Sequence, residues 1–219
     1  MKRLLINITI LLFFSYNISY SQNFYGGISG GIIFSQVDGD TYGGYHKLSP
    51  IGGAYVRNTL GNNWEFSLGM EYKRKGSKEV QRNEWGDLVF YYSINLDYIE
   101  VPVIFSKKIE KIEIPGLFKY KFPKDLLIDL GLSYGYLIKG FEEDMTGPLN
   151  PEFGRPFKKY EIAHQMGITY RFSKKMFFTW RFSYTNFMLP VRSHPGGQTY
   201  WFNRGQYNQN QSLILRYEF

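Results

Sequence analysis

Cysteine is absent from the 219-residue chain, which excludes disulfide bonds, thiol nucleophiles, cysteine-based metal sites and a lipidated N-terminal cysteine. Histidine occurs only three times. Long apolar runs are also lacking, since the longest, residues 4–14, is eleven positions long and contains Asn7 and Thr9. A membrane-spanning helix needs ~20 apolar residues, so the sequence excludes a helical membrane protein.

The first 21 residues have the layout of an export signal. A basic start, Met1-Lys2-Arg3, precedes the apolar stretch, and Ser19 and Ser21 occupy the two positions that a signal peptidase reads. We therefore expect residues 1–21 to be a cleaved signal peptide and residues 22–219 to form one exported domain. The net charge is +7, but export separates the protein from nucleic acid, so we expect no nucleic-acid partner.

Beyond the signal, apolar and polar residues alternate with a period of two, which is typical of β-strands. In residues 176–185, for example, Phe178 and Trp180 share one face, while Thr179 and Arg181 share the other. The registers of the first two segments are less defined, because both are rich in glycine. The alternating segments predict eight antiparallel strands: 24–34, 49–59, 64–72, 95–105, 126–139, 160–172, 176–185 and 206–219.

The apolar face of these segments is rich in aromatic residues, and the chain has 19 Tyr, 19 Phe and 4 Trp. Soluble sheets bury mainly aliphatic residues, whereas aromatic side chains near strand ends form the girdles of transmembrane barrels. The polar face carries acids and bases in near balance, which can pair in a narrow lumen. We therefore expect an all-β, eight-stranded antiparallel transmembrane β-barrel with a filled lumen. The predicted lumen charge network is Glu65, Glu71, Lys73, Glu100, Asp129, Lys139, Glu161, Arg171, Arg181 and Arg216, with Glu218 on the same face.

Short and long connections alternate along the chain. Short turns of such barrels face the periplasm and long loops face outward, so both termini are expected to be periplasmic. The expected short turns are 60–63 and 173–175, and the expected long loops are 35–47, 76–93, 140–157 and 188–205.

Residues 107–125 depart from this alternation, because nineteen residues stand where a short turn is expected. Within them, residues 112–118 repeat the pattern of residues 99–105. Three interpretations stay open: a hairpin that extends below the membrane, a periplasmic docking element, or two more strands that make the barrel ten-stranded. The bases of the docking element would be Lys107, Lys108, Lys111, Lys119, Lys121 and Lys124.

Four stretches carry a resemblance to a known family. They are GGIIFSQVDGDTYGGY at 30–45, LGMEYKRKGS at 68–77, LDYIEVPVIF at 96–105 and LGLSYGYLI at 130–138. Through them the chain resembles the PorT-like small outer-membrane β-barrels of Bacteroidota. The resemblance implies a barrel in the outer membrane of a Gram-negative bacterium, and PorT itself is tied to the type IX secretion machinery. None of the four motifs is catalytic, and residues 107–125 depart from the family's compact pattern.

Catalytic and metal sites have little support in the sequence. A lipid hydrolase would need His, Ser and a carboxylate close together, and His46, His164 and the Ser193-His194 pair are the available candidates. We expect no enzyme and no cofactor, with loop histidines that are simply solvated. The Asp38-Gly39-Asp40 motif could hold Ca²⁺, but it is more typical of a turn.

The remaining candidate residues concern lipid and assembly. Basic residues expected near the outer rim could contact lipopolysaccharide phosphates. The candidates are Arg74, Lys75, Lys158 and Lys159. The aromatic C-terminus, with Leu215, Tyr217 and Phe219 at alternate positions, matches a barrel-assembly signal.

Two functions follow from these expectations. The first is a non-enzymatic accessory or structural subunit of an outer-membrane complex, with outer-membrane or periplasmic proteins and lipopolysaccharide as partners. The alternative is a conduit or carrier for small or lipophilic ligands, through the lumen or a lateral opening.

Overall fold

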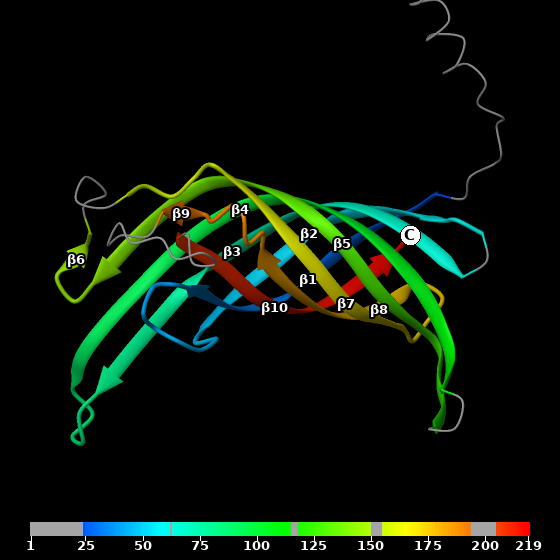
Figure 1. Ribbon diagram of the computed structural model, residues 1–219, viewed down its shortest axis with the longest axis horizontal. Coiled ribbons are helices and arrows are strands. Elements are labelled where there is room, and N and C mark those ends of the chain that lie inside the picture. Colours follow the sequence, from blue (N-terminus) through cyan, green and yellow to red (C-terminus); the bar gives the residue numbers. More distant parts are fainter. Residues whose placement is uncertain (1–23, 62, 115–117, 150–154, 194–204) are drawn as a thin grey trace, which may run out of the picture.

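The computed structural model describes residues 24–61, 63–114, 118–149, 155–193 and 205–219, with the backbone alone at 110–114 and 118–124. These residues form one antiparallel sheet that curls into a ring (Figure 1). The strands are β1 (Phe24–Asp38), β2 (Lys47–Thr59), β3 (Trp64–Arg82), β4 (Leu88–Ile114), β5 (Phe118–Asp144), β6 (Gly147–Pro148), β7 (Tyr160–Arg171), β8 (Met176–Thr185), β9 (Arg192–Ser193) and β10 (Gly205–Glu218).

Eight long strands make the ring, in the order β1-β2-β3-β4-β5-β7-β8-β10. The ring closes because β1 also pairs with β10, from Gly27 opposite Glu218 to Asp38 opposite Tyr207. The short strands β6 and β9 add two residues each to the edges of β5 and β10. The predicted eight-stranded antiparallel barrel is therefore confirmed. Among the described residues, no helix is long and apolar enough to cross a membrane.

The period-two pattern separates an outer wall from a lumen. In β7, exposed Tyr160, Ile162 and Met166 alternate with buried Glu161 and Ala163. Apolar side chains thus face outward where a lipid phase would cover them, and polar ones face inward, which is the inverse of a soluble protein.

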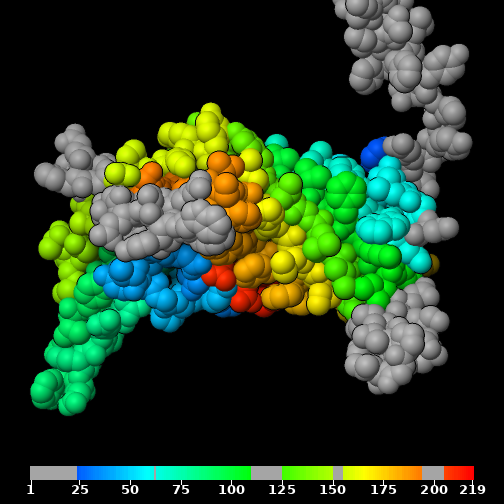
Figure 2. All heavy atoms as spheres, viewed as in Figure 1, coloured from blue at the N-terminus to red at the C-terminus, as the bar shows by residue number. Residues whose placement is uncertain are grey.

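The two ends of the barrel differ in their connections. The β2–β3 turn is tight, with left-handed φ values of 68° at both Gly61 and Asn63, and the Leu60 N–H donates to the Trp64 carbonyl at 2.8 Å. This turn, the β7–β8 turn and both ends of the described chain lie at one end, which we call the turn end (Figure 1). The longer connections lie at the opposite, loop end. There the β3–β4 hairpin projects beyond the rest of the barrel (Figure 2).

The β4–β5 hairpin settles how residues 107–125 are built. Both strands are 27 residues long, and their pairing continues past Lys111 opposite Lys121 to Ile114 opposite Phe118. The segment therefore lengthens two strands of the ring, as the hairpin-extension interpretation predicted, and does not insert two more. The expected outer loop at 76–93 is likewise mostly strand, since β3 continues to Arg82 and β4 begins at Leu88.

A β-bulge corrects one predicted lumen residue. Asp97 pairs with Lys139, but the next residue, Tyr98, pairs with Leu137, so Ile138 is an extra residue in β5. A bulge shifts the alternation by one position. Leu137, before the bulge, keeps its inward position and is buried, whereas Lys139, after the bulge, is exposed on the outer wall with its Nζ 5.2 Å from the Phe141 ring centroid.

Candidate functional site

The lumen is filled at its turn end by a chain of ion pairs. Arg57 makes a two-pronged contact with Glu218, with Nε–Oε1 at 2.6 Å and Nη2–Oε2 at 2.8 Å. Glu65 joins this pair to a second arginine, at 3.3 Å from Arg57 Nη1 and 2.7 Å from Arg171 Nη2. The four side chains come from β2, β3, β7 and β10, so the network ties together strands far apart in sequence.

A second network crosses the middle of the lumen. Arg181 Nη1 lies 3.1 Å from Glu71 Oε1, and Lys73 Nζ lies 3.0 Å from Glu71 Oε2 and 2.7 Å from Glu100 Oε2. Lys75 continues the chain by pairing with both Glu100 and Glu161, the latter at 2.9 Å. The three bases and three acids are all buried and balance one another. Glu161 also accepts hydrogen bonds from Thr185 Oγ1 at 2.6 Å and Asn208 Nδ2 at 3.1 Å.

Other polar and aromatic groups complete the filling between the two networks. The Arg216 guanidinium lies 3.8 Å from the Tyr55 ring centroid, and Thr169 donates to Asp129 at 2.5 Å. A cavity of about 10 Å³ beside Tyr55, Glu71, Arg181 and Arg216 is about one water's worth of space.

An apolar cluster closes the lumen toward the loop end. It consists of Val37, Ile94, Leu96, Tyr98 and Leu137, with Tyr92 and Phe157 packed against it. The interior is thus part ion-pair network and part hydrophobic core. Such filling is typical of an eight-stranded barrel, whose interior is just wide enough to be filled by side chains.

The structure places the predicted network residues inside the barrel, apart from Lys139, and adds residues that the sequence analysis missed. Arg57 was missed because Gly52 and Gly53 obscured the register of β2. Lys75 was expected at the outer rim as a lipopolysaccharide contact, and the structure corrects this: its side chain is 0% exposed. The alternation Glu71, Lys73, Lys75 continues because β3 does not end where a loop was expected.

The other expected lipid-contact residues lie on the surface. Lys158 and Lys159 are exposed, and Arg74 is held by Asp97 through Nε–Oδ1 at 2.7 Å. Lipid binding by these three residues stays a prediction.

The histidines and the Asp-Gly-Asp motif lie in separate settings. His46 Nδ1 is 3.3 Å from Glu79, and His164 Nε2 is 3.0 Å from the Asn186 amide nitrogen, while His194 is outside the described residues. Asp40 accepts the Tyr42 N–H at 2.9 Å, which makes an Asx turn of the kind expected for this motif, and burial raises the pKa of the Asp40 carboxyl. Within the described residues, no group of three or more His, Asp or Glu side chains could hold a metal ion.

The C-terminal residues lie on the outer wall. Leu215, Tyr217 and Phe219 are exposed, and the rings of Tyr217 and Phe219 meet edge to face with centroids 6.1 Å apart. The Phe219 N–H donates to the Gly26 carbonyl at 3.1 Å, so the last residue contributes to the closing seam.

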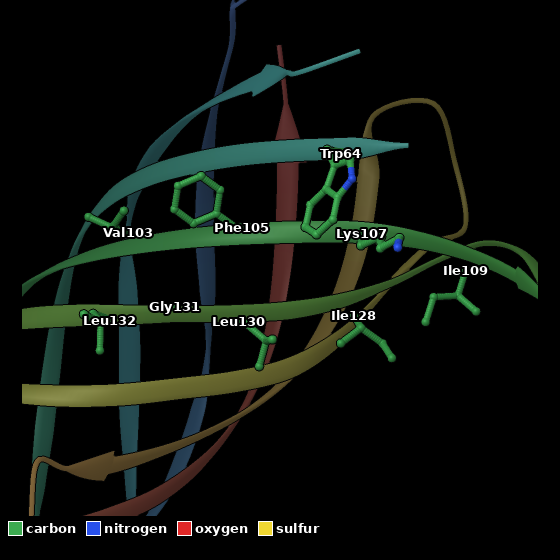
Figure 3. Close-up of a pocket in the computed structure, with 9 residues that line it drawn as sticks. All are labelled: Trp64, Val103, Phe105, Lys107, Ile109, Ile128, Leu130, Gly131 and Leu132. Carbon is green, nitrogen blue, oxygen red and sulfur yellow. The ribbon is translucent and has the colours of Figure 1, made fainter. Parts of the chain in front are cut away.

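The outer wall has an apolar depression at its turn end, where β3, β4 and β5 lie side by side (Figure 3). Its volume is about 660 Å³. Phe105 packs on Phe66 with ring centroids 5.2 Å apart, and Lys107 Nζ lies 5.1 Å from the Trp64 ring centroid. Figure 3 shows the lining side chains of the three strands: Trp64, Val103, Phe105, Lys107, Ile109, Ile128, Leu130, Gly131 and Leu132.

One of the predicted docking bases lies at this depression. Lys107 lines it, and Lys108 pairs with Asp125 at 2.7 Å. The side chains of Lys111, Lys119, Lys121 and Lys124 lie outside the described residues. The signal peptide, residues 1–21, also lies outside them.

Solved structures with a similar fold include Ail, the attachment invasion locus protein of Yersinia pestis, in complex with the heparin analogue sucrose octasulfate. It is 15% identical with a TM-score of 0.45, and the match covers 90% of this chain and 99% of Ail. Neisserial surface protein A is 9% identical with a TM-score of 0.41, covering 90% and 97% of the two chains. OprG from Pseudomonas aeruginosa is 9% identical with a TM-score of 0.37, covering 90% and 94%. No curated protein matches the sequence.

The sequence itself matches one family model. The model is described as an outer membrane protein beta-barrel domain, and it matches residues 20–188, which is most of the chain. That range begins just before β1 and ends after β8, so it contains seven of the eight strands of the ring. The chain therefore belongs to the outer membrane protein beta-barrel domain family.

Proposed function

We propose that the protein acts without catalysis, as an accessory or structural subunit of an outer-membrane protein complex. The proposal includes the PorT-like affiliation within Bacteroidota, a link to type IX secretion, and cleavage of residues 1–21 on export. In this role the barrel wall and the β4–β5 hairpin bind other outer-membrane or periplasmic proteins.

The observation that carries the proposal is the joining of the apolar depression to the β4–β5 hairpin at the turn end. Ile109 and Ile128 belong both to the depression and to the base of the extension. A partner could therefore contact two surfaces together: the depression of about 660 Å³ on the outer wall, and the hairpin that extends beyond the turn end. Lys107 places a positive charge at the edge of this surface.

The filled lumen supports the same proposal by opposing the conduit alternative. Solute would have to displace buried pairs such as Lys75–Glu161, and opening this pair costs free energy because it takes from the buried Glu161 carboxylate the lysine that neutralises it. The outer surfaces are then the parts of the molecule free to act on other molecules.

The test is affinity isolation of the protein from native outer membranes in mild detergent, followed by size exclusion and mass spectrometry. We expect one stoichiometric partner with the wild type. Two variants should lose it: the pair Ile128→Ala and Leu130→Ala, and a chain in which residues 110–124 are replaced by an Asn-Gly turn. The pair Ile162→Ala and Met166→Ala, equally exposed on β7, is the matched control and should keep the partner.

Two results would contradict the proposal. One is a wild-type barrel that elutes alone, and the other is a partner that stays bound to both test variants. Folding of each variant is checked by the heat-dependent shift of barrels on gels. A steady conductance of the wild type in a planar bilayer would instead favour the conduit.

A further inference from the structure

The ladder between β2 and β3 stops before either strand ends. Its last pair is Ile51 opposite Lys73. Beyond it β2 continues to Lys47 paired only with β1, and β3 continues to Arg82 paired only with β4. Over the loop-end part of these two strands, facing backbone edges are therefore left without a ladder between them.

Two residues explain why the strands separate here. Pro50, the first residue of β2 past the ladder, has no N–H to donate to β3. In β3, Gly76 has a φ of +133°, and a Cβ at this position would clash with the Ile94 carbonyl oxygen. Only glycine suits this backbone, which ties β3 closely to β4 on one side while its other edge is free of β2.

A polar cavity of about 330 Å³ occupies the separation. Residues of β2 and β3 form its two sides, and Tyr91 and Glu143, from β4 and β5, also line it. Its cations are Lys47, Arg74 and Lys78, against the single carboxylate of Glu143, which already accepts the Tyr91 hydroxyl at 2.7 Å.

The three cations differ in their partners. Arg74 is held by Asp97 outside the cavity lining. Lys47 is only 6% exposed, yet its Nζ donates to the neutral Asn95 Oδ1 at 2.5 Å and lies 3.5 Å from Ser93 Oγ. A buried ammonium held by neutral acceptors gains much from an anion that reaches it.

The residues around the cavity indicate that its ligand is an anion with an apolar part. Leu48, next to Lys47, is 60% exposed on the outer wall, and Ile32 of the neighbouring β1 is exposed beside Pro50. An acyl chain can lie on these residues while a head group enters between the strands. Free phosphate would gain nothing from that apolar wall.

We propose that the separation between β2 and β3 is a lateral lipid-binding site, which takes the phosphate of an outer-leaflet lipid against Lys47 and Lys78 and its acyl chains beside Leu48. The site is independent of partner docking at the turn end, because it lies at the opposite end of the barrel.

The test measures binding of phosphorylated lipid A to the purified full mature barrel in detergent micelles. The same lipid without its phosphates, and inorganic phosphate alone, are the comparison probes. We expect the wild type to prefer phosphorylated lipid A, and the pair Lys47→Gln and Lys78→Gln to weaken that binding by about tenfold or more. The pair Lys174→Gln and Lys175→Gln removes the same charge from exposed positions in the β7–β8 turn, at the opposite end of the barrel, and should leave binding unchanged.

A second measurement does not depend on the stability of the lysine variants. Because the chain has no cysteine, Ser49→Cys introduces a single thiol into the cavity lining. Phosphorylated lipid A should slow its reaction with a charged thiol reagent, and the phosphate-free lipid should not.

Three outcomes would overturn the proposal. They are equal weakening by the two lysine pairs, equal binding of the lipid with and without phosphate, and binding of inorganic phosphate as tight as that of the lipid. The last outcome would assign the cavity to a soluble anion.

Discussion

Arg57 grips Glu218, the penultimate residue of the chain, through two parallel contacts of 2.6 and 2.8 Å inside the barrel. The pair joins β2 to β10, and between them lies β1, whose two ladders close the ring. The ion pair therefore bridges the two neighbours of β1, across the seam where the ring closes. We expect it to make a large contribution to the free energy of unfolding of the barrel.

Arg57→Ala should lower the free energy of unfolding by about 3–5 kcal/mol, because it leaves the buried carboxylate of Glu218 unpaired. Urea unfolding in lipid vesicles, followed by tryptophan fluorescence, measures the change. Lys108→Ala is the control: both side chains of its pair with Asp125 are well exposed, at 32% and 43%, so it should cost only about 0–1 kcal/mol. If the two variants lose equal free energy of unfolding, the buried Arg57–Glu218 pair contributes no more to stability than an exposed ion pair.

Lys75→Met separates a structural role from a lipid-binding role. Two buried carboxylates, Glu100 and Glu161, lose their shared cation, so unfolding should become easier by about 3–5 kcal/mol. Adding Glu161→Gln should restore part of the loss, because one unpaired charge is removed. Lipid A binding should stay at the wild-type level in any variant that folds. If the Lys75→Met barrel is stable but no longer binds lipid A, the structural role of Lys75 is contradicted and the original prediction of a lipid contact is supported.

Gly76→Ala should destabilise the barrel by about 1–3 kcal/mol, since its φ of +133° and the nearby Ile94 carbonyl leave no place for a methyl group. Gly30→Ala is the control, because a Cβ there meets nothing within 4 Å. Unfolding in urea distinguishes the two. A neutral Gly76→Ala would mean that the backbone of β3 can relax toward β2.

Phe219→Ala tests the assembly signal at the C-terminus. The amount of folded barrel in cellular outer membranes should fall severalfold, while refolding of the purified protein into micelles should be nearly unchanged. Phe178→Ala, which removes a similarly outward aromatic from β8, should leave the cellular amount almost unaltered. A parallel loss in micelles would assign Phe219 a packing role only.

The strand pattern of the ring could be predicted from the sequence because lipid and lumen impose opposite polarities on alternate residues. Segments such as β7 and β8 are mostly apolar on one face and mostly polar on the other, so their register follows directly from the alternation. The same alternation correctly predicted that nearly all charged residues of the lumen network, including Glu71 and Arg181, face the interior.

The failures have local backbone causes. Lys139 follows a bulge at Ile138, and a period of two contains no sign of an extra residue. Lys75 was assigned to the rim because the glycine that follows it suggested a loop, whereas Gly76 keeps β3 next to β4. The separation of β2 from β3 depends on which strand edges meet, and that is a property of the closed ring rather than of any one segment.

The closing seam also sets an order of events for the growing chain. The first strand of the barrel finds its second neighbour only in the last fourteen-residue strand, β10. Until those residues are present, β1 and the unfinished sheet keep exposed hydrogen-bonding edges, which other chains can pair with. One edge of β1 therefore has no partner in an incomplete chain, and the ring can close only when β10 is present.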